Sequence, residues 1–198
     1  MGENRNHPAK GETIRVDPIR EEKDIRNIKK LLSDKPRDLA IFTLGINTNL
    51  RASDLLKITV GQVRHLKVGE HFTIKEKKTG KERIITLNKT VHHAIANLLT
   101  TMPDATDDSP LFRSRKGGKP LCVPYLSGLT KKWCRSINLR GNYGSHTLRK
   151  TFGYIHRTVF STSVPVLMEM FNHSSQKQTL AYLGIQEADI KDAYLKEI

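Results

Sequence analysis

Residues 144–152 read GSHTLRKTF, and this stretch decides both how the chain folds and what it can bind. Ser145 is of a residue type that commonly caps the N-terminus of a helix. His146 and Arg149 are three residues apart, so they share one face of that helix. We expect an exposed helix start that presents an imidazole and a guanidinium beside free backbone N–H groups, an arrangement suited to a phosphate. Read alone, the pair is more typical of solvated surface side chains.

The composition favours a basic globular protein that binds a polyanion. The chain has 198 residues, enough for one domain with a sizeable core, and 34 Lys and Arg against 20 Asp and Glu give a formal charge of +14. So large an excess makes nucleic acid the first candidate partner. The alternative is a basic protein whose charge serves solubility alone.

The cysteines and the hydropathy pattern point to a cytoplasmic protein. Cys122 and Cys134 are too few for a disulfide framework or a zinc site, so we expect reduced thiols and no metal ion. The N-terminus has no apolar signal region, and no apolar run approaches the length of a membrane span, so no membrane partner is expected.

A second basic motif, RASDLL, occupies residues 51–56. Ser53 is expected to cap a short helix, and Asp54 falls in its first turn, where a carboxylate suits the helix dipole. Arg51 sits in the turn before this helix. There it can aim its guanidinium at a bound anion, or it can be an ordinary surface side chain.

A hairpin with a lysine-rich tip is predicted in the middle of the chain. Apolar side chains alternate with polar ones over residues 72–74, and a second short apolar run covers 84–87. Between them the chain reads KEKKTGKER over 75–83, where Gly80 permits a tight turn. Lysines at such a tip usually serve to keep an edge strand from pairing with another chain, but Lys78 could also contact a DNA phosphate.

The remaining pattern is mainly helical, with capping residues and prolines marking the helix starts. Helices are predicted from Asp17-Pro18 to about 33, after Pro36 to 46, from Asn88 to 99, from Val123 to 137, from 164 to 171, from 174 to 183, and from 187 to 198. The segment 113–119 is basic and contains two glycines, so it is expected to contact phosphate.

Taken together, these residues resemble the tyrosine recombinase family, also called the phage integrase family. The resemblance covers nearly the whole chain from about residue 17. It rests on RASDLL at 51–56, on HTLR at 146–149, and on FNHSS at 171–175 followed by Tyr182 nine residues after His173. Lys78, before Thr79-Gly80, matches the hairpin lysine of the family. The family often has glycine where this chain has Asn49 and Asn172, and asparagine tolerates a left-handed backbone best after glycine.

The resemblance implies a mainly α fold with a small antiparallel three-stranded β-sheet, the fold of the recombinase catalytic domain. It implies that catalysis depends on Arg51, Lys78, His146, Arg149, His173 and the nucleophile Tyr182, supported by Asp54. DNA contacts are expected from Lys77, Lys81, Arg113, Arg115, Lys116, Lys119 and Lys150.

The implied partner is double-stranded DNA, bound by a monomer that assembles into a homo-oligomer, a tetramer, at the synapse. No cofactor is implied. Residues 1–16 are expected to be a flexible arm or linker, 17–198 the catalytic domain, and 187–198 a C-terminal tail helix. The chain is then a fragment without an upstream DNA clamp or a minimal member of the family.

The implied activity is site-specific cleavage and rejoining of DNA through a 3′-phosphotyrosine, as used in integration, excision or inversion. Relaxation of DNA by a type IB topoisomerase uses the same chemistry and stays an alternative. A DNA-binding regulator that has lost catalysis is the other. Of the remaining tyrosines, Tyr125 and Tyr154 are expected to be buried, Tyr143 lies in a turn, and Tyr194 lies on the tail helix.

Overall fold

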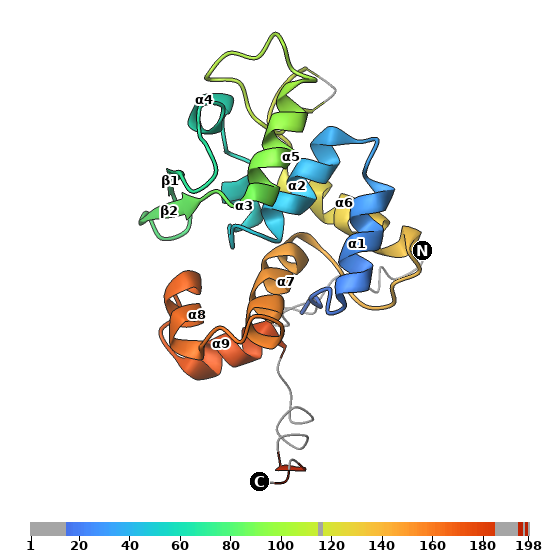
Figure 1. Cartoon of the computed structure of the whole chain (residues 1–198), viewed down its shortest axis with the longest axis vertical. Helices are drawn as coiled ribbons and strands as arrows, with labels where there is room; N and C mark the ends of the chain where they lie inside the picture. Colours follow the sequence, from blue (N-terminus) through green and yellow to red (C-terminus); the bar gives the residue numbers. More distant parts are fainter. Residues whose placement is uncertain (1–14, 115–116, 185–193, 196, 198) are drawn as a thin grey trace, which may run out of the picture.

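The structure is a computed structural model that describes residues 15–114, 117–184, 194–195 and 197 (Figure 1). It is mainly helical, as expected. The elements are α1 (Glu22–Leu31), α2 (Pro36–Gly45), α3 (Ala52–Leu55), α4 (Val60–Val63), β1 (His71–Lys75), β2 (Glu82–Thr86), α5 (Lys89–Leu99), α6 (Val123–Ser136), α7 (Ser145–Thr158), α8 (Val164–Phe171) and α9 (Gln176–Leu183).

The predicted hairpin is present as strands β1 and β2. They pair antiparallel with His71 opposite Thr86 and Lys75 opposite Glu82. Gly80 has a φ of +69° in the connecting turn, a conformation that favours glycine. The inward-facing side chains of Phe72 and Ile85, which lie opposite each other, belong to the main core. The lysine-rich tip therefore extends from a firmly anchored base.

The expectation of a third strand is wrong for the described residues, whose sheet has two strands. Two isolated bridges, Thr59 with Pro110 and Arg113 with Pro120, are the nearest approach to further pairing. In each of them one partner is a proline. Proline has no N–H to donate to a ladder, so neither bridge can extend into a strand by the usual pattern.

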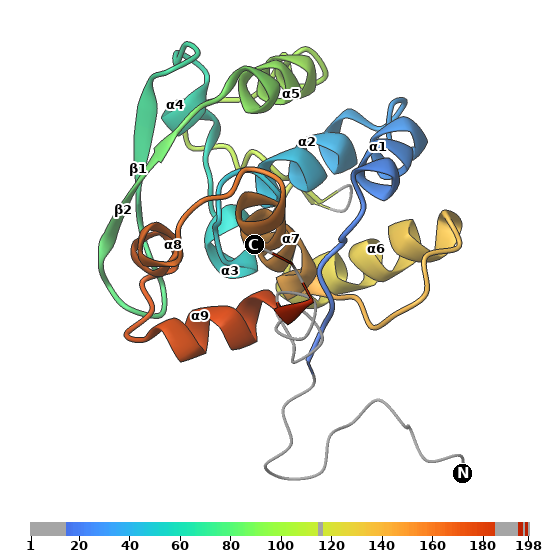
Figure 2. The ribbon, with the colours of Figure 1, turned by 60° about the horizontal axis from the view of Figure 1, so that its bottom comes forward.

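The main core surrounds α2, which is packed against α5 on one side and contacts α1, α3 and α7 on others (Figure 2). Its central run, from Ala40 to Leu44, is buried on every face. Trp133 of α6 is buried in this core and packs edge-on against Phe42, with ring centroids 5.9 Å apart. Helix α7 passes between this body and the last two helices.

Helices α8 and α9 pack on each other and on α7, and they have a small core of their own. Its buried members are Phe152, Leu167, Phe171 and Leu183, with Tyr182 packed against them. Figure 1 shows this pair at the lower end of the molecule, below the larger helical body. Few buried side chains hold this unit, and it carries part of the candidate site.

Several helix boundaries agree with the capping signals. The Asn88 side chain accepts from Val91 N–H at 2.8 Å, and Ser175 accepts from Gln178 N–H at 3.2 Å. Gly184 ends α9 in the left-handed conformation, with a φ of +75°. The predicted start at Asn88 is confirmed, and local hydrogen bonding and backbone conformation set all three of these helix ends.

Other helix starts differ from the prediction because tertiary hydrogen bonds compete. The first helix begins at Glu22 rather than at Asp17, since Ile19 N–H donates to the Thr151 hydroxyl at 2.8 Å and keeps this segment extended against α7. Gly144 occupies the cap position predicted for Ser145, and its N–H donates to Thr147 Oγ1 at 3.0 Å.

Helix α3 begins two residues earlier than predicted, with Arg51 in the cap position predicted for Ser53. Most of the predicted arm, residues 1–14, lies outside the described residues, as do residues 187–193, 196 and 198 of the predicted tail helix. The division into arm, domain and tail therefore stays a prediction. In the part of the chain that the structure describes, no helix is long and apolar enough to span a membrane.

Candidate active site

Arg51 is held at the entrance to α3 by an extended backbone, with a ψ of 150°. Two residues earlier, Asn49 adopts a left-handed backbone with a φ of +54°, which turns the chain into this position. The Arg51 guanidinium lies 2.7 Å from the carboxylate of Glu76, at the end of β1. Arg51 is thus fixed by tertiary contacts and is not a free surface side chain.

Asp54 ties the hairpin to α3. Its side chain is fully buried, and Oδ1 accepts a hydrogen bond from the backbone N–H of Lys77 at 3.0 Å. The next residue is Lys78, whose side chain is exposed at the hairpin tip. The positive charge of Lys78 contributes to a lowered pKa of His146, so the tip lies within electrostatic reach of α7.

Arg149 is buried, contrary to the exposed helix start expected from the sequence. It is 3% exposed, because Phe171 of α8 and Tyr182 of α9 lie over its guanidinium. Its Nη2 donates to the carbonyl of Phe171 at 3.1 Å, and its guanidinium lies 5.0 Å from the Phe171 ring centroid. Burial, only partly offset by the nearby Tyr182, lowers the pKa of Arg149 to about 10, so it stays charged at neutral pH.

His146 stands on the exposed side of the same helix. Desolvation, followed by repulsion from Arg149 and Arg51, lowers the pKa of its imidazole below the ordinary value of 6.5. The ring is therefore neutral at pH 7. A neutral imidazole has a free nitrogen lone pair, which is what accepting a proton requires.

His173 follows the left-handed Asn172, whose φ of +55° ends α8. Its Nδ1 lies 3.1 Å from the Thr179 hydroxyl of α9, and its ring stacks on Phe171 with centroids 5.2 Å apart. Burial first, then the positive charges of Arg149 and Arg51, lowers the pKa of His173 to about 4. The ring is neutral at pH 7.

Tyr182 lies on α9 among these groups. Its ring centroid is 5.3 Å from that of His173 and 6.0 Å from the Arg149 guanidinium. Burial raises the pKa of the phenol above 10, while the positive charges of Arg149 and Arg51 act in the opposite direction. The two arginines would stabilise a phenolate in this position.

Lys150 is placed differently from the DNA contact that was expected. It is 8% exposed, and its ammonium lies 5.4 Å from the centroid of the Tyr182 ring. Burial is the largest cause of its lowered pKa. The neighbour of Arg149 along the helix therefore supports the tyrosine ring by a cation–π contact.

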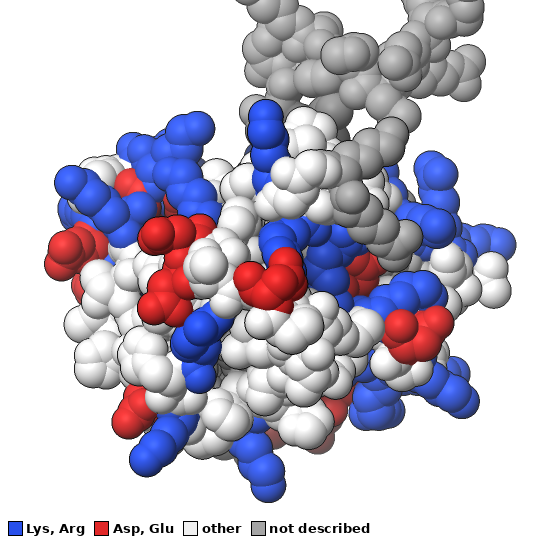
Figure 3. Space-filling view, turned by 90° about the horizontal axis from the view of Figure 1, so that it is seen from above, with Lys and Arg blue, Asp and Glu red and all other residues white. Residues whose placement is uncertain are grey.

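The other expected DNA contacts are scattered. Lys77, Lys81 and Lys119 are exposed, while Arg113 forms a two-pronged ion pair with Asp104 at 3.0 and 3.1 Å. Arg115 and Lys116 lie outside the described residues. Figure 3 shows Lys and Arg side chains spread over the face seen from above, with fewer acidic side chains between them.

The structure brings together three segments that are distant in the sequence, which carry Arg51, the pair His146 and Arg149, and the pair His173 and Tyr182. Sequence reasoning missed Glu76 and Arg83, which form an ion pair beside Arg51. The sequence pattern indicated this pair only in that an acidic and a basic residue occupy inward-facing positions of the predicted hairpin. Among the described residues, no group of three or more His, Cys, Asp or Glu could hold a metal ion. Cys122 and Cys134 are free thiols.

The fold and the site define a class of protein, the tyrosine recombinases, which are enzymes that cleave and rejoin DNA. The chain belongs to the phage integrase family, whose family model matches residues 19–188.

Two curated relatives show the extent of the similarity. The probable integrase/recombinase YoeC of Bacillus subtilis (strain 168) is 33% identical over 180 residues, which cover 90% of this chain and 95% of that protein. The tyrosine recombinase XerC of Caldanaerobacter subterraneus subsp. tengcongensis is 30% identical over 176 residues, 85% of this chain but only 48% of that protein.

Solved structures share the fold at lower identity. The XerA recombinase superposes with a TM-score of 0.73 at 16% identity, over 95% of this chain and 65% of that one. XerH bound to its palindromic difH substrate in a post-cleavage complex also gives a TM-score of 0.73, at 18% identity, over 96% of this chain and 55% of that one. The chain thus spans about half to two thirds of these two neighbours.

Proposed function

We propose that the chain is a site-specific DNA recombinase that breaks and rejoins strands through a covalent 3′-phosphotyrosine on Tyr182. The observation that carries the proposal is that the Tyr182 ring lies beside His173 and Arg149, with Arg51 and His146 near enough to interact electrostatically with Arg149. Double-stranded DNA is the substrate. The related structures solved with DNA, including a lambda integrase dimer bound to a core site, support this choice.

The chemistry assigns a role to each group. The Tyr182 oxygen attacks phosphorus, the bond to the 5′-oxygen breaks, and the products are a 3′-phosphotyrosine and a free 5′-hydroxyl. His146 accepts the phenolic proton, and Lys78 supplies a proton to the leaving oxygen. Attack by a 5′-hydroxyl reverses the sequence, so rejoining needs no external energy source.

Charge on the transition state is met by the arginines. Arg51 and Arg149 can donate paired hydrogen bonds to the non-bridging oxygens, with His173 adding another through Nε2. Loss of one such donor costs roughly 10²–10³ in rate, about 3–4 kcal/mol. These groups are positioned before substrate arrives, which is the condition for electrostatic catalysis.

The proposal extends to assembly and location. The chain acts as a homo-oligomer on DNA, a tetramer at the synapse formed from free monomers, in the cytoplasm. The multimeric DNA complexes among the structural neighbours support assembly on DNA.

A nicked suicide duplex from the native locus tests the activity. We expect a covalent protein–DNA adduct that survives denaturation, with peptide mapping placing the DNA on Tyr182. Tyr182→Phe should abolish the adduct and keep DNA binding, because only the hydroxyl is lost.

Tyr194→Phe is the matched control, since Tyr194 is exposed and outside the site, and it should form the adduct normally. Absence of any adduct with the native chain would favour a regulator that only binds DNA. Relaxation of supercoiled DNA without a sequence requirement would instead favour a topoisomerase.

A further inference from the structure

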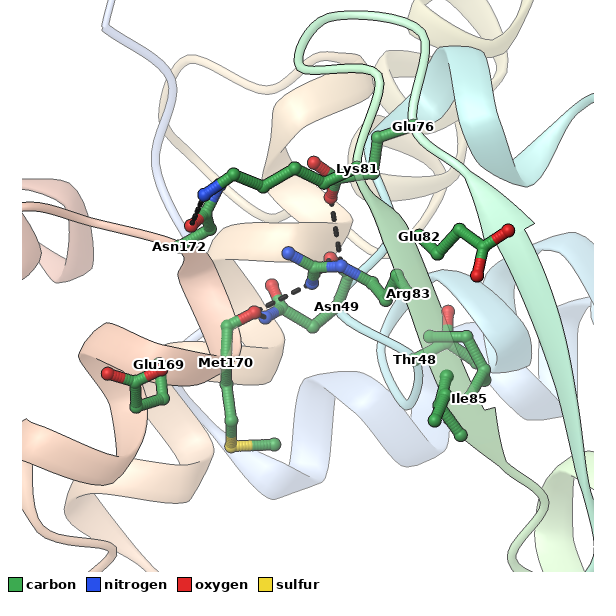
Figure 4. A pocket seen from close by; sticks show the side chains of 11 residues that line it. Thr48, Asn49, Glu76, Lys81, Glu82, Arg83, Ile85, Glu169, Met170 and Asn172 are labelled. Atoms are coloured by element: carbon green, nitrogen blue, oxygen red, sulfur yellow. Dashed lines mark hydrogen bonds and ion pairs between the residues drawn. The ribbon is translucent and has the colours of Figure 1, made fainter.

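A buried carboxylate lies directly behind Arg51. The Glu76 side chain is 2% exposed, and each of its oxygens contacts a different arginine. Figure 4 shows its ion pair with Arg83. Oε2 is 2.7 Å from Arg51 Nη1 and also accepts the Thr79 hydroxyl at 2.7 Å. Oε1 is 2.8 Å from Arg83 Nε. Glu76 therefore joins the candidate site to the base of the hairpin.

The ionisation of Glu76 depends on these partners. Burial alone would raise its pKa, but the Thr79 hydroxyl and the two arginines outweigh burial and lower the pKa below the ordinary value. The group is a carboxylate at neutral pH. A buried charge of this kind is tolerated because it is paired on both oxygens, and its removal would leave two nearby arginines to repel each other.

Arg83 extends the connection to α8. Its Nη1 donates to the carbonyl of Met170 at 2.7 Å, and the amide of Asn49 donates to the same carbonyl. Figure 4 shows Arg83 between Glu76 and Met170, in a pocket of about 380 Å³ between β2 and the end of α8. The hairpin, the segment before α3 and the last turn of α8 thus meet at one ion pair.

We propose that Glu76 is the positioning residue for Arg51, and that with Arg83 it fixes the hairpin against α8 when the site is assembled. This inference rests on the proposed recombinase function. With one edge of the guanidinium bound to Glu76, the remaining N–H groups of Arg51 are oriented for phosphate. The same contacts set the separation between Lys78 on the hairpin and His173 after α8.

Glu76→Gln tests the inference because it keeps the shape and removes the charge. We expect single-turnover cleavage of a nicked suicide duplex, at saturating protein, to fall about 10- to 100-fold, since a displaced transition-state donor costs up to about 10² in rate. The dissociation constant for DNA should change less than about twofold, because Glu76 is buried away from the phosphates.

Glu82→Gln is the matched control. Glu82 lines the same pocket on the neighbouring strand, but it is exposed to solvent. It should leave the cleavage rate unchanged. Equal slowing by the two variants would show that any loss of negative charge in this region has the same effect, and the inference would be wrong.

A neutral substrate separates positioning from general distortion. A methylphosphonate at the cleaved linkage carries no negative charge, so a displaced arginine matters less for it. The defect of Glu76→Gln, relative to the native chain on the same substrate, should therefore be several-fold smaller with the methylphosphonate than with the phosphate. A defect of the same size on both would mean that Glu76 is merely structural.

Thermal unfolding of each variant establishes that it is folded. If Glu76→Gln does not fold, Glu76→Asp replaces it, because the shorter side chain keeps the charge but cannot reach both arginines. It should cleave slowly with the same relief on the neutral substrate, and cleavage at the native rate would overturn the inference. If the native chain forms no adduct, both the proposed function and the positioning role of Glu76 are wrong. If it forms the adduct but cleaves no faster than Glu76→Gln, only the positioning role of Glu76 is wrong.

Discussion

Substitution of Gly45 by alanine should displace the helix that carries Arg149. Gly45 is the last residue of α2, and a Cβ placed there would lie 2.5 Å from Leu148 Cδ1 and 2.9 Å from Leu148 Cβ. A change of rotamer can move Cδ1 away. It cannot move Cβ, so the backbones of α2 and α7 must separate by several tenths of an ångström.

The expected magnitude follows from the comparison with a second glycine. Gly128 lies inside α6, and a Cβ there meets nothing within 4 Å, so Gly128→Ala should stabilise the protein by up to about 1 kcal/mol through helix propensity. Gly45→Ala should be less stable than this variant by about 1–3 kcal/mol, the usual cost of overpacking. For a chain of this size, that difference is about 2–12 °C in Tm.

Thermal unfolding and adduct formation measure the two consequences. We expect Gly45→Ala to cleave more slowly per folded molecule, up to about 100-fold, because Arg149 follows Leu148 directly in α7. Leu148→Ala alone should lower the free energy of unfolding by about 2–5 kcal/mol. The double variant with Gly45→Ala should lose less than the sum of the two single losses, because Leu148→Ala removes the clashing Cγ and Cδ1. The reasoning is refuted if Gly45→Ala and Gly128→Ala are equally stable and equally active.

Three further outcomes are expected. Lys150→Met should slow adduct formation several-fold with DNA affinity unchanged. Lys119→Met, at an exposed position, should instead weaken DNA binding and reduce the slope of log binding constant against log salt concentration by about 1. The reverse pattern would contradict the structure. His173, with its pKa lowered to about 4, should titrate by NMR well below the ordinary value of 6.5. The imidazole of His173 binds its proton near pH 6.5 in the unfolded chain but only near pH 4 in the folded one. Between these values its contribution should lower the free energy of unfolding as the pH falls. A gain from His173 over this range would contradict the prediction. The affinity of the native chain for DNA should fall steeply between low and physiological salt, and a flat dependence would exclude phosphate contacts as its main source.

The sequence by itself determined the local features of the fold. Helix caps at Asn88 and Ser175, the left-handed turns at Asn49 and Asn172, and the hairpin turn at Gly80 all depend on hydrogen bonds or steric limits within a few residues. The motifs at 51–56, 146–149 and 171–175 with Tyr182, taken in this order, also carried the resemblance to the family, and the family model confirms it.

Only the tertiary structure decided where each side chain is buried and what it contacts. Arg149 and Lys150 looked like exposed cations, yet the packing of α8 and α9 on α7 buries both beside the candidate nucleophile Tyr182. Glu76 and Arg83 looked like ordinary charges in a hairpin, yet they form the ion pair that holds Arg51. Burial and pairing of charges arise between segments distant in the chain, so no local pattern encodes them, and the same physical cause sets the lowered pKa of His173.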